Sequence, residues 1–286
     1  KEMPVDTDQI FIVDRDFNYL GSLLITTLLT EEPEKIVTSL INNDASKPIN
    51  AETDEAEVAL MFEQRNLISA PVIDENNQLV GRITIDDVVD VIRDQAEHSV
   101  MSMVGLDEDE DVFAPIFQSS KRRSVWLGVN LITAFIAVYF IGLFEATLQQ
   151  KIALAILMPV VASMGGIAGT QTLIIVTRGI ATGRVTSANI KTLINKEVAV
   201  SGLNGIIWSI VIGLITYYWF SDLLLSLVIA LAIITNLLVA AFSGAFLPLA
   251  LTKLKIDPAL AGGVILTTIT DVIGFVAFLG LAALFI

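Results

Sequence analysis

Five long apolar runs dominate the second half of the chain and constrain its fold more than any other feature. They cover Val125–Phe144, Ile152–Thr177, Val198–Ser221, Leu223–Thr252 and Pro258–Ile286, and Asp271 is the one charged residue within them. About 20 apolar residues are enough for an α-helix to cross the hydrocarbon core of a bilayer. The runs therefore predict five transmembrane helices, and the mean hydropathy of +0.72 agrees with a membrane protein.

The charged residues divide the chain at the same place. Residues 1–120 carry 26 of the 31 acidic side chains but only seven of the 17 basic ones, a net charge of −19. Residues 121–286 have a basic excess of +5. We therefore expect a strongly acidic, water-soluble domain followed by a mildly basic membrane domain. An acidic protein is a poor partner for nucleic acid, whose phosphates require a basic surface.

Residue types that support much of enzyme chemistry are scarce. The chain contains no cysteine, which excludes disulfides, thiolate metal sites and iron–sulfur clusters. Its single histidine, His98, excludes the HExxH zinc motif and most imidazole catalysis. We therefore expect a protein that is not an enzyme.

The basic residues between the apolar runs predict an orientation. If the acidic domain is cytoplasmic, nine of the ten basic residues of the membrane domain lie on the inner side and only Lys151 lies outside. Because cytoplasmic loops carry an excess of Lys and Arg, this arrangement is favoured. We expect a multi-pass protein of the cell membrane with its C-terminus outside. Lys1 is not an initiator residue, so we also expect the chain to start within a longer protein.

Several polar or small residues interrupt the apolar runs. The segment Met158–Thr172 combines Pro159, three glycines and small polar residues. It predicts a broken helix whose freed carbonyls face a cavity or an ion, and close helix packing is the alternative. Asn204 and Asn236 also lie within apolar runs, and we expect each to form an interhelical hydrogen bond.

Asp271 is the acid expected deepest in the membrane. It follows Asp257 by 14 residues, about 21 Å along a helix, and no basic residue occurs at a comparable depth. A carboxylate there costs about 2.5–3.5 kcal/mol and usually meets a partner or a water-filled path. We expect a mobile cation as that partner; a protonated Asp bonded to a neighbouring helix is the alternative.

The ligands available in the membrane domain favour a hard cation. Carboxylate, amide, hydroxyl and carbonyl oxygens suit Mg²⁺, Ca²⁺ or Mn²⁺ rather than softer metals. One carboxylate per chain suits Mg²⁺, which keeps its waters and can be held through them. In a symmetric dimer, two copies of Asp271 would face one axial ion.

The acidic half contains an internal repeat with an offset of 60 residues. Phe11–Leu29 aligns with Pro71–Val89, and each unit reads as a strand, an Asp/Asn turn, a second strand and a helix. A capped helix over Thr53–Asn66 precedes the second unit. The sequence therefore predicts two copies of one α/β unit.

The second copy resembles a CBS domain. Pro71–Asp74 and Gly81–Thr84, followed by Asp87, are similar to the family's strand and ribose-binding motif. The resemblance implies that Thr84 and Asp87 hold the ribose of an adenine nucleotide such as ATP. Thr27 occupies the position of Asp87 in the first copy, so at most one nucleotide site is intact. The alternative is that Asp87 only begins a helix.

A dense row of acids follows the repeat. Ile85–Val104 predicts a long helix toward the membrane, and its ridge of acids comprises Asp86, Asp87, Asp90, Asp94 and Glu97. Like charges at this density repel one another, and a divalent cation would relieve the repulsion, so we expect cation sensing on this ridge. For the five adjacent acids Asp107–Asp111 we favour a solvated loop.

The whole layout resembles the MgtE family of magnesium channels or transporters. The motif segments are Met164–Gln171, Asp257–Leu260, Thr267–Asp271 and Gly142–Glu145. The resemblance implies a homodimer in which Asp271 meets a hydrated Mg²⁺ and Gly263 and Thr267 line the same path. It also implies that Asp87, Asp90 and neighbouring acids bind cytosolic Mg²⁺ and hold the pore closed. Ile167 replaces the Asn usual after the glycine pair, which leaves selectivity among divalent cations open.

We therefore expect a multi-domain fold: an α/β CBS-domain pair, a connecting helix and an all-α domain of five transmembrane helices. The expected domains are a partial first CBS domain (1–46), a second CBS domain (47–92), an acidic connecting, plug-like helix and loop (93–120) and a pore domain (121–286). The expected function is Mg²⁺ transport gated by cytosolic Mg²⁺, in contact with the bilayer, a second copy and no nucleic acid. The alternatives are transport of Mn²⁺ or Ca²⁺, and a membrane-tethered adenine-nucleotide sensor without transport.

Overall fold

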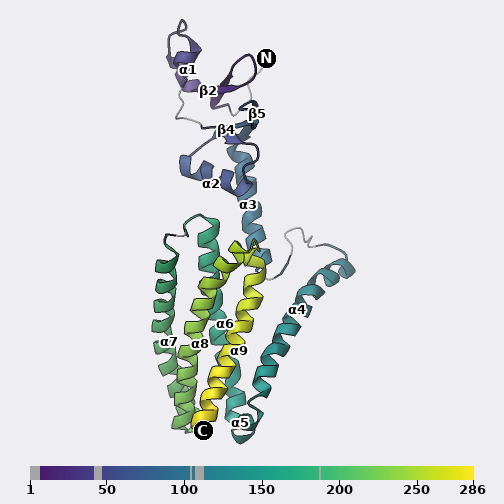
Figure 1. Ribbon diagram of the computed structural model, residues 1–286, viewed down its shortest axis with the longest axis vertical. Helices are drawn as coiled ribbons and strands as arrows, with labels where there is room; N and C mark the ends of the chain where they lie inside the picture. Colours follow the sequence, from purple (N-terminus) through teal and green to yellow (C-terminus); the bar gives the residue numbers. More distant parts are fainter. Residues whose placement is uncertain (1–6, 42–46, 104, 107–112, 187) are drawn as a thin grey trace. The chain divides into compact units, whose positions relative to one another are not determined.

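The computed structural model describes residues 7–41, 47–103, 105–106, 113–186 and 188–286 (Figure 1). The chain forms two compact units, Lys1–His98 and Ser99–Ile286. The first is a mixed α/β unit and the second is a helical unit. Val104 and Asp107–Asp111, which belong to two of the sequence predictions, lie outside the described residues.

The α/β unit contains the two predicted copies. The first copy consists of β1 (Gln9–Val13), β2 (Tyr19–Leu24), α1 (Ile25–Thr30) and a short 3₁₀ helix, η1 (Val37–Ser39). The second copy consists of β3 (Ile49–Asn50), α2 (Glu55–Arg65), β4 (Ser69–Ile73), β5 (Leu79–Thr84) and α3 (Ile85–Ser102), whose last residues belong to the helical unit. β1 and β2 are antiparallel; β4 lies between a parallel β3 and an antiparallel β5.

The offset of 60 residues between the two copies also appears in the backbone structure. β1 and β4 begin 60 residues apart, as do β2 and β5, and each hairpin has its register irregularity at the equivalent place. In both turns an aspartate accepts two backbone N–H groups through one oxygen, at 2.8 and 2.9 Å for Asp14 and at 2.9 and 2.8 Å for Asp74. The Asn18 side-chain amide also donates to the second oxygen of Asp14 at 2.8 Å. This bond for Asp14, and the backbone bond from Gln78 for Asp74, contribute most to holding the pKa of each carboxyl below its usual range.

Hydrogen bonds join the two copies across the α/β unit. The Gln9 side chain donates to the Ser69 carbonyl at 2.8 Å, and the Ser69 hydroxyl donates to Asp8 at 2.6 Å. At the turns, the Tyr19 amide donates to the Asn77 carbonyl at 2.9 Å. Because these contacts pair equivalent ends of the two hairpins, the copies form one domain pair, as predicted.

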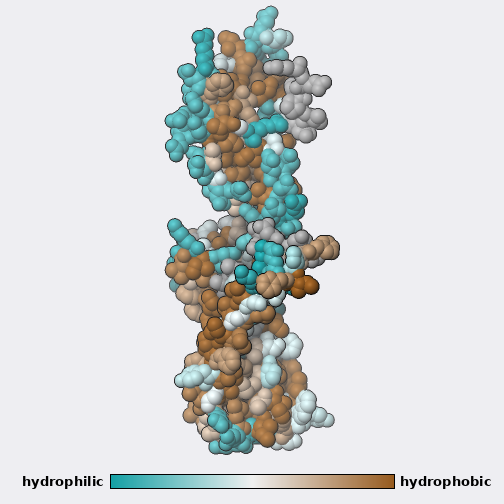
Figure 2. Space-filling view, turned by 90° about the vertical axis from the view of Figure 1, so that its right-hand side faces the viewer, coloured by the Kyte–Doolittle hydropathy of each residue, from teal (hydrophilic) through white to brown (hydrophobic). Residues whose placement is uncertain are grey.

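The helical unit confirms the five predicted spans. Its helices are α4 (Ile116–Gly142), α5 (Glu145–Gln150), α6 (Ile152–Ala181), α7 (Ile190–Phe220), α8 (Leu223–Lys253) and α9 (Pro258–Phe285). All except α5 contain a stretch long and apolar enough to cross a membrane. On the face drawn in Figure 2, hydrophobic side chains cover most of the surface of these helices, as a bilayer requires.

The core of the helical unit centres on α8. This helix packs along α6, α7 and α9, and its interior residues Leu225, Ile229 and Ile233 are fully buried. α4 is different: it contacts chiefly α9 and diverges from the other helices toward its N-terminal end (Figure 1). Only 6% of the apolar window of α4 is buried, against 50% for α8, so α4 leaves most of its apolar surface open.

The predicted break in the Met158–Thr172 segment is wrong. α6 continues without interruption through Pro159 and all three glycines. A Cβ at Gly165 would lie 2.2 Å from the Asn236 amide nitrogen, and a Cβ at Gly244 would lie 2.6 Å from the Gly169 carbonyl. The small residues therefore allow α6 and α8 to approach closely, which was the alternative interpretation.

The interhelical hydrogen bonds predicted for Asn204 and Asn236 differ in outcome: one is present and the other is not seen. Asn236 is fully buried on α8 and donates to the Val161 carbonyl of α6 at 2.9 Å, which confirms the predicted interhelical hydrogen bond. Asn204 lies exposed on α7, and among the described residues its side chain has no hydrogen bond.

Candidate functional site

The start of α9 fixes the position of the candidate ion path. Asp257 is the N-cap, and its carboxylate accepts the Ala259 N–H at 2.8 Å. Pro258 follows at the first helical position, where its missing N–H is not needed. The Asp-Pro pair of the sequence motif is therefore a helix-start signal that sets which residues of α9 share a face.

One face of α9 carries the three residues predicted to line the path. Gly263, Thr267 and Asp271 are spaced by four and so lie one above another. Thr267 is exposed, and Gly263 and Asp271 are half-buried. The Thr267 hydroxyl donates to the Gly263 carbonyl at 2.9 Å, which leaves its oxygen free to accept a further hydrogen bond.

A cavity of about 340 Å³ lies beside this face, among α4, α6, α9 and the segment after α3. Gly263 and Thr267 line it, together with Asn130 of α4 and Thr170 of α6. Trp126 closes another part of its wall, and a Cβ at Gly105 would lie 2.5 Å from the Trp126 ring. The cavity thus presents amide, hydroxyl and carbonyl oxygens, which suit a hydrated hard cation.

Asp271 supplies a carboxylate farther along the same face. Within the ranges that the structure describes, no hydrogen bond or ion pair reaches this carboxylate. A cationic side chain is therefore not its partner in a single chain, and the predicted alternative of a bond to a neighbouring helix is not seen there either. The arrangement leaves a negative charge available to a mobile cation.

Sequence reasoning missed Asn130 and Thr170. Asn130 interrupts the first apolar run in the same way as Asn204 and Asn236, and that signal was sufficient to single it out. Thr170 lies inside the small-residue segment of α6, but only the packing of α6 against α9 shows that it faces the cavity. Ile167 lies one turn before Thr170 and its side chain is 57% exposed, so it flanks the same face.

The acidic ridge on α3 is exposed, and part of it already has partners. Asp87 accepts hydrogen bonds from the Thr84 amide at 3.1 Å and the Thr84 hydroxyl at 3.0 Å, which makes the pair a cap of α3. Arg93 lies between Asp90 and Asp94, 3.4 Å from each. The sequence analysis did not anticipate that Arg93 offsets part of the charge of the ridge.

No cation site is complete on α3 within one chain. Across the described ranges, no three side chains of His, Cys, Asp or Glu come together as metal ligands. All five ridge acids, Asp86, Asp87, Asp90, Asp94 and Glu97, are exposed to solvent. A cation bound there by described residues would therefore be held by one or two carboxylates and water, or by a second chain.

Two family models match separate parts of the chain. The model of the MgtE family, described as a divalent cation transporter, matches residues 158–281, and the CBS domain model matches residues 43–94. "Magnesium transporter MgtE" of Bacillus subtilis (strain 168) is 31% identical over 287 residues, covering 100% of this chain and 63% of that protein. The protein of the same name from Enterococcus faecalis (strain ATCC 700802 / V583) is 26% identical, covering 96% of this chain and 60% of its own length.

One solved structure is similar in sequence to about a third of the chain. The cystathionine β-synthase pair domain of a putative Mg²⁺ transporter from Shewanella oneidensis MR-1 is 29% identical, with a TM-score of 0.32, and covers 34% of this chain and 56% of that one. The present chain spans about three fifths of the length of the two curated relatives. The chain is similar to the MgtE family of divalent cation transporters over residues 158–281 and to a CBS domain over residues 43–94.

Proposed function

We propose that this protein moves Mg²⁺ across a membrane along the α9 face formed by Gly263, Thr267 and Asp271. The observation that carries the proposal is Asp271, a carboxylate within a membrane helix that has no partner among the described residues. The oxygen-lined cavity beside Gly263 and Thr267 extends the path. The names of the two relatives, both called magnesium transporters, support Mg²⁺ as the cargo.

The open face of α9 supports a homodimer. A half-buried carboxylate against lipid is unfavourable by about 2.5–3.5 kcal/mol, and a second copy would shield it from lipid. A two-fold axis along this face would place two copies of Asp271 around one hydrated Mg²⁺. Because the chain has no cysteine, Thr267→Cys would introduce the only thiol, and it should cross-link two copies under oxidation.

Thr268→Cys is the matched control for that experiment. Thr268 makes the same hydrogen bond to the carbonyl four residues earlier, at 2.8 Å, but does not line the cavity. We expect a cross-linked dimer on a denaturing gel for Thr267→Cys and little for Thr268→Cys. Equal cross-linking of both, or of neither, would remove the proposed axis.

We also propose that the α/β unit is cytoplasmic and the C-terminus external, since basic residues gather at one end of the helices. Single cysteines at Ser39 in the first copy and at Ile286 provide the test. In right-side-out vesicles, an impermeant thiol reagent should label Ile286→Cys directly and Ser39→Cys only after permeabilisation. Labelling in the opposite order would overturn the orientation.

Gating is proposed to depend on the α3 acids. Cytosolic Mg²⁺ would offset their mutual repulsion and favour a closed state, whereas low Mg²⁺ would favour an open one. The triple variant Asp90→Asn, Asp94→Asn and Glu97→Gln leaves the Thr84–Asp87 cap intact. We expect inhibition of flux by cytosolic Mg²⁺ to require a higher Mg²⁺ concentration in this variant.

A triple variant elsewhere in the α/β unit controls for net charge. Glu52→Gln, Glu63→Gln and Glu75→Gln remove the same number of exposed carboxylates from other elements. Inhibition should be unchanged in this control. If both triple variants respond alike, the effect belongs to overall charge and not to α3.

We also propose a nucleotide site at Thr84 and Asp87, where a ribose would compete with existing hydrogen bonds. Asp87 already accepts two hydrogen bonds from Thr84, so a ribose would have to share or displace them. Calorimetric titration of the full chain with ATP, alone and with Asp87→Asn, tests the site. Binding that is unchanged by Asp87→Asn would exclude this residue from the site.

The decisive experiment for transport uses the full chain in proteoliposomes with Mg²⁺ varied on each side. We expect Mg²⁺ flux that falls as Mg²⁺ rises on the side of the α/β unit. Competition by Mn²⁺ or Ca²⁺ for the same flux tests the alternative cargo that Ile167 leaves open. Tight ATP binding without any flux would instead support a membrane-tethered nucleotide sensor.

A further inference from the structure

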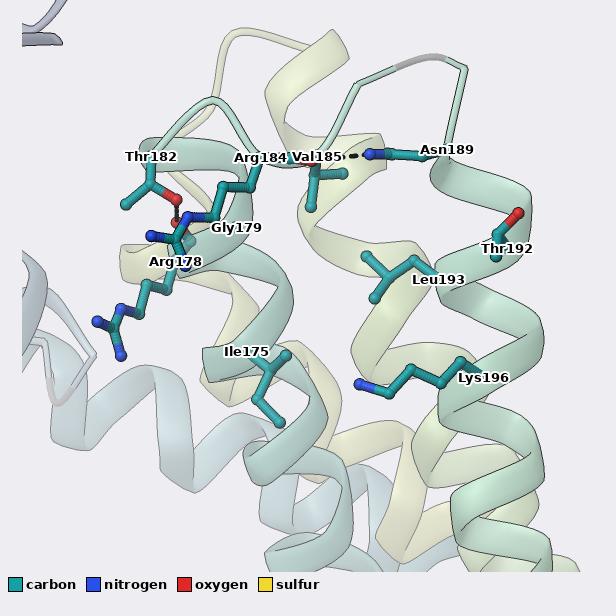
Figure 3. Close-up of a pocket in the computed structure, with 10 residues that line it drawn as sticks. All are labelled: Ile175, Arg178, Gly179, Thr182, Arg184, Val185, Asn189, Thr192, Leu193 and Lys196. Carbon is teal, nitrogen blue, oxygen red and sulfur yellow. Dashed lines mark hydrogen bonds between the residues drawn. The ribbon is translucent and has the colours of Figure 1, made fainter. Parts of the chain in front are cut away.

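A pocket of about 590 Å³ lies where α6 ends and α7 begins, away from the α9 face (Figure 3). Three basic residues line it: Arg178 and Arg184 near the end of α6, and Lys196 on α7. Ile175 of α6 and Leu193 of α7 supply apolar walls. The pocket therefore combines several positive charges with a hydrophobic lining.

The positive charges of this pocket are largely uncompensated. Among the described residues, no acidic side chain lines it, and neither Arg178 nor Arg184 has an ion pair. Lys196 does have a partner, since its ammonium lies 3.3 Å from the buried carboxylate of Glu197. Two guanidinium groups thus remain available to an anion, and guanidinium binds phosphate oxygens in a bidentate manner.

The loop that carries Arg184 is held in place by hydrogen bonds to α6 and to the start of α7. The Val185 amide donates to the Gly179 carbonyl at 2.9 Å, and the Asn189 side chain donates to the Arg184 carbonyl at 2.8 Å. A Cβ at Gly179 would lie 2.5 Å from Val185, so this close approach requires glycine. These contacts fix the conformation of the loop between α6 and α7 that forms this wall of the pocket.

The directions of the side chains separate a charged rim from an apolar gap. In Figure 3, Ile175 extends from α6 toward α7, and Leu193 and Lys196 extend from α7 toward α6. The guanidinium groups of Arg178 and Arg184 extend along the outer side of the last turn of α6. Both arginines are exposed and have long flexible side chains, so they can turn toward a ligand at the rim.

The pocket lies at the level expected for lipid headgroups. The charge-free run of α6 ends at Thr177, directly before Arg178. Below the pocket, exposed apolar side chains continue on both helices, with Ile174 39% exposed on α6 and Leu203 63% exposed on α7. The cations therefore lie at the boundary between the hydrocarbon-spanning surface and water.

We propose that this pocket binds one anionic phospholipid. Its phosphate would lie between Arg178, Arg184 and Lys196, and the upper part of an acyl chain would lie against Ile175 and Leu193. Basic pockets between membrane helices recognise headgroups through this combination of charge and apolar surface. Free phosphate would use the cations alone and would gain nothing from the apolar walls, so the lining favours a lipid.

Native mass spectrometry of the full chain titrated with dioleoylphosphatidylglycerol, dioleoylphosphatidylcholine or inorganic phosphate tests the proposal. The main variant is Arg178→Gln with Arg184→Gln, which keeps the Lys196–Glu197 pair and so avoids an unpaired buried acid. A cation near the bilayer surface contributes about fivefold to lipid affinity, so the double variant should bind phosphatidylglycerol about 25-fold more weakly. The control is Lys191→Gln with Lys253→Gln, which removes two charges outside the pocket and should bind as the wild type does.

Two further measurements separate a lipid from a free anion. Leu193→Ser should weaken binding of phosphatidylglycerol without changing the response to inorganic phosphate. The wild type should also retain phosphatidylglycerol in the presence of excess inorganic phosphate, and should prefer it to phosphatidylcholine. Displacement by phosphate, equal binding of the two lipids, or unchanged binding in the arginine double variant would each overturn the proposal.

Discussion

Asn236 and Asp271 are both polar residues within apolar membrane helices, but their surroundings differ completely. Asn236 lies in the interior of the bundle, fully buried, with its amide donating to the Val161 carbonyl. Gly165 and Gly274 lie directly against it, and a Cβ at either would come within 2.6 Å of its amide nitrogen. Asp271 lies one turn from Gly274 on α9 and has no such partner among the described residues.

This difference distinguishes a polar group that holds helices together from one that we propose to meet the transported ion. A fully buried polar side chain that donates a hydrogen bond to a neighbouring helix, as Asn236 does, holds helices together. A carboxylate that the bundle leaves without a partner is unfavourable in a membrane unless something outside the chain completes its surroundings. The two residues therefore predict opposite responses: substitutions around Asn236 should change stability, and substitutions along the Asp271 face should change transport.

The largest effect on stability is expected for Asn236→Asp. The new carboxylate would be fully buried and would face the Val161 carbonyl, which cannot donate a hydrogen bond. An unpaired buried charge costs more than about 3 kcal/mol, so the unfolding temperature of the purified protein in detergent should fall sharply. A variant as stable as the wild type would show that the interior around Asn236 admits water.

Gly165→Ala should destabilise the helical unit less, but still measurably. The new methyl group would lie 2.2 Å from the Asn236 amide, so α6 and α8 would have to separate, at a cost of about 1–3 kcal/mol. Gly166→Ala is a matched control on the same helix, because a Cβ there meets nothing within 4 Å. Thermal unfolding of both variants should separate them; equal unfolding temperatures would contradict the packing interpretation.

Along the open face, Thr267→Val should reduce transport without reducing stability. It replaces the hydroxyl that lines the cavity with a methyl group and keeps the shape of the side chain. One hydrogen bond contributes about 0.5–1.5 kcal/mol, so Mg²⁺ flux should fall about two- to tenfold. Thr268→Val, which removes the equivalent bond outside the cavity, should leave flux unchanged, and a similar loss in both variants would refute a specific role.

The smallest effect is expected at the far end of the bundle, where Lys151 forms an ion pair with Asp222. The hydrogen bond from Lys151 holds the pKa of Asp222 below its ordinary value, so the pair stabilises the fold above about pH 4 and the stabilisation is lost as pH falls through the lowered pKa. Asp222→Asn removes the charge but keeps a residue type that can cap α8. Its unfolding free energy should be lower than that of the wild type by less than about 1 kcal/mol at neutral pH.

The difference between Asp222→Asn and the wild type should disappear in acid, where Asp222 is protonated. Unfolding of both proteins followed across pH provides the measurement. A difference that persists below the lowered pKa would show that the effect of Asp222 does not come from its charge.

Sequence patterns predicted the elements whose formation depends on neighbouring residues. The lengths of the apolar runs located the five spans, and the offset of 60 residues located both hairpins. Both succeeded because residues close in sequence determine the burial of a helix and the geometry of a turn. The capped helix predicted over Thr53–Asn66 is likewise present as α2, with Asp54 as its N-cap.

Contacts between residues far apart in the sequence determine the features that the sequence did not predict. The close approach of α6 to α8 depends on Gly165 meeting Asn236, 71 residues away, which composition does not reveal. The cavity beside Thr267 depends on Thr170 and Asn130, which α6 and α4 bring to the same place.

The most direct test of the account is Mg²⁺ flux through proteoliposomes that contain Asp271→Asn. The substitution keeps the size of the side chain and removes its charge, and an interaction of about 3 kcal/mol with the ion corresponds to a flux reduced by about 100-fold. Its unfolding temperature should not fall below that of the wild type, because among the described residues the carboxylate has no partner to lose. Wild-type flux through Asp271→Asn, with the fold intact, would contradict the claim that this carboxylate meets the transported ion.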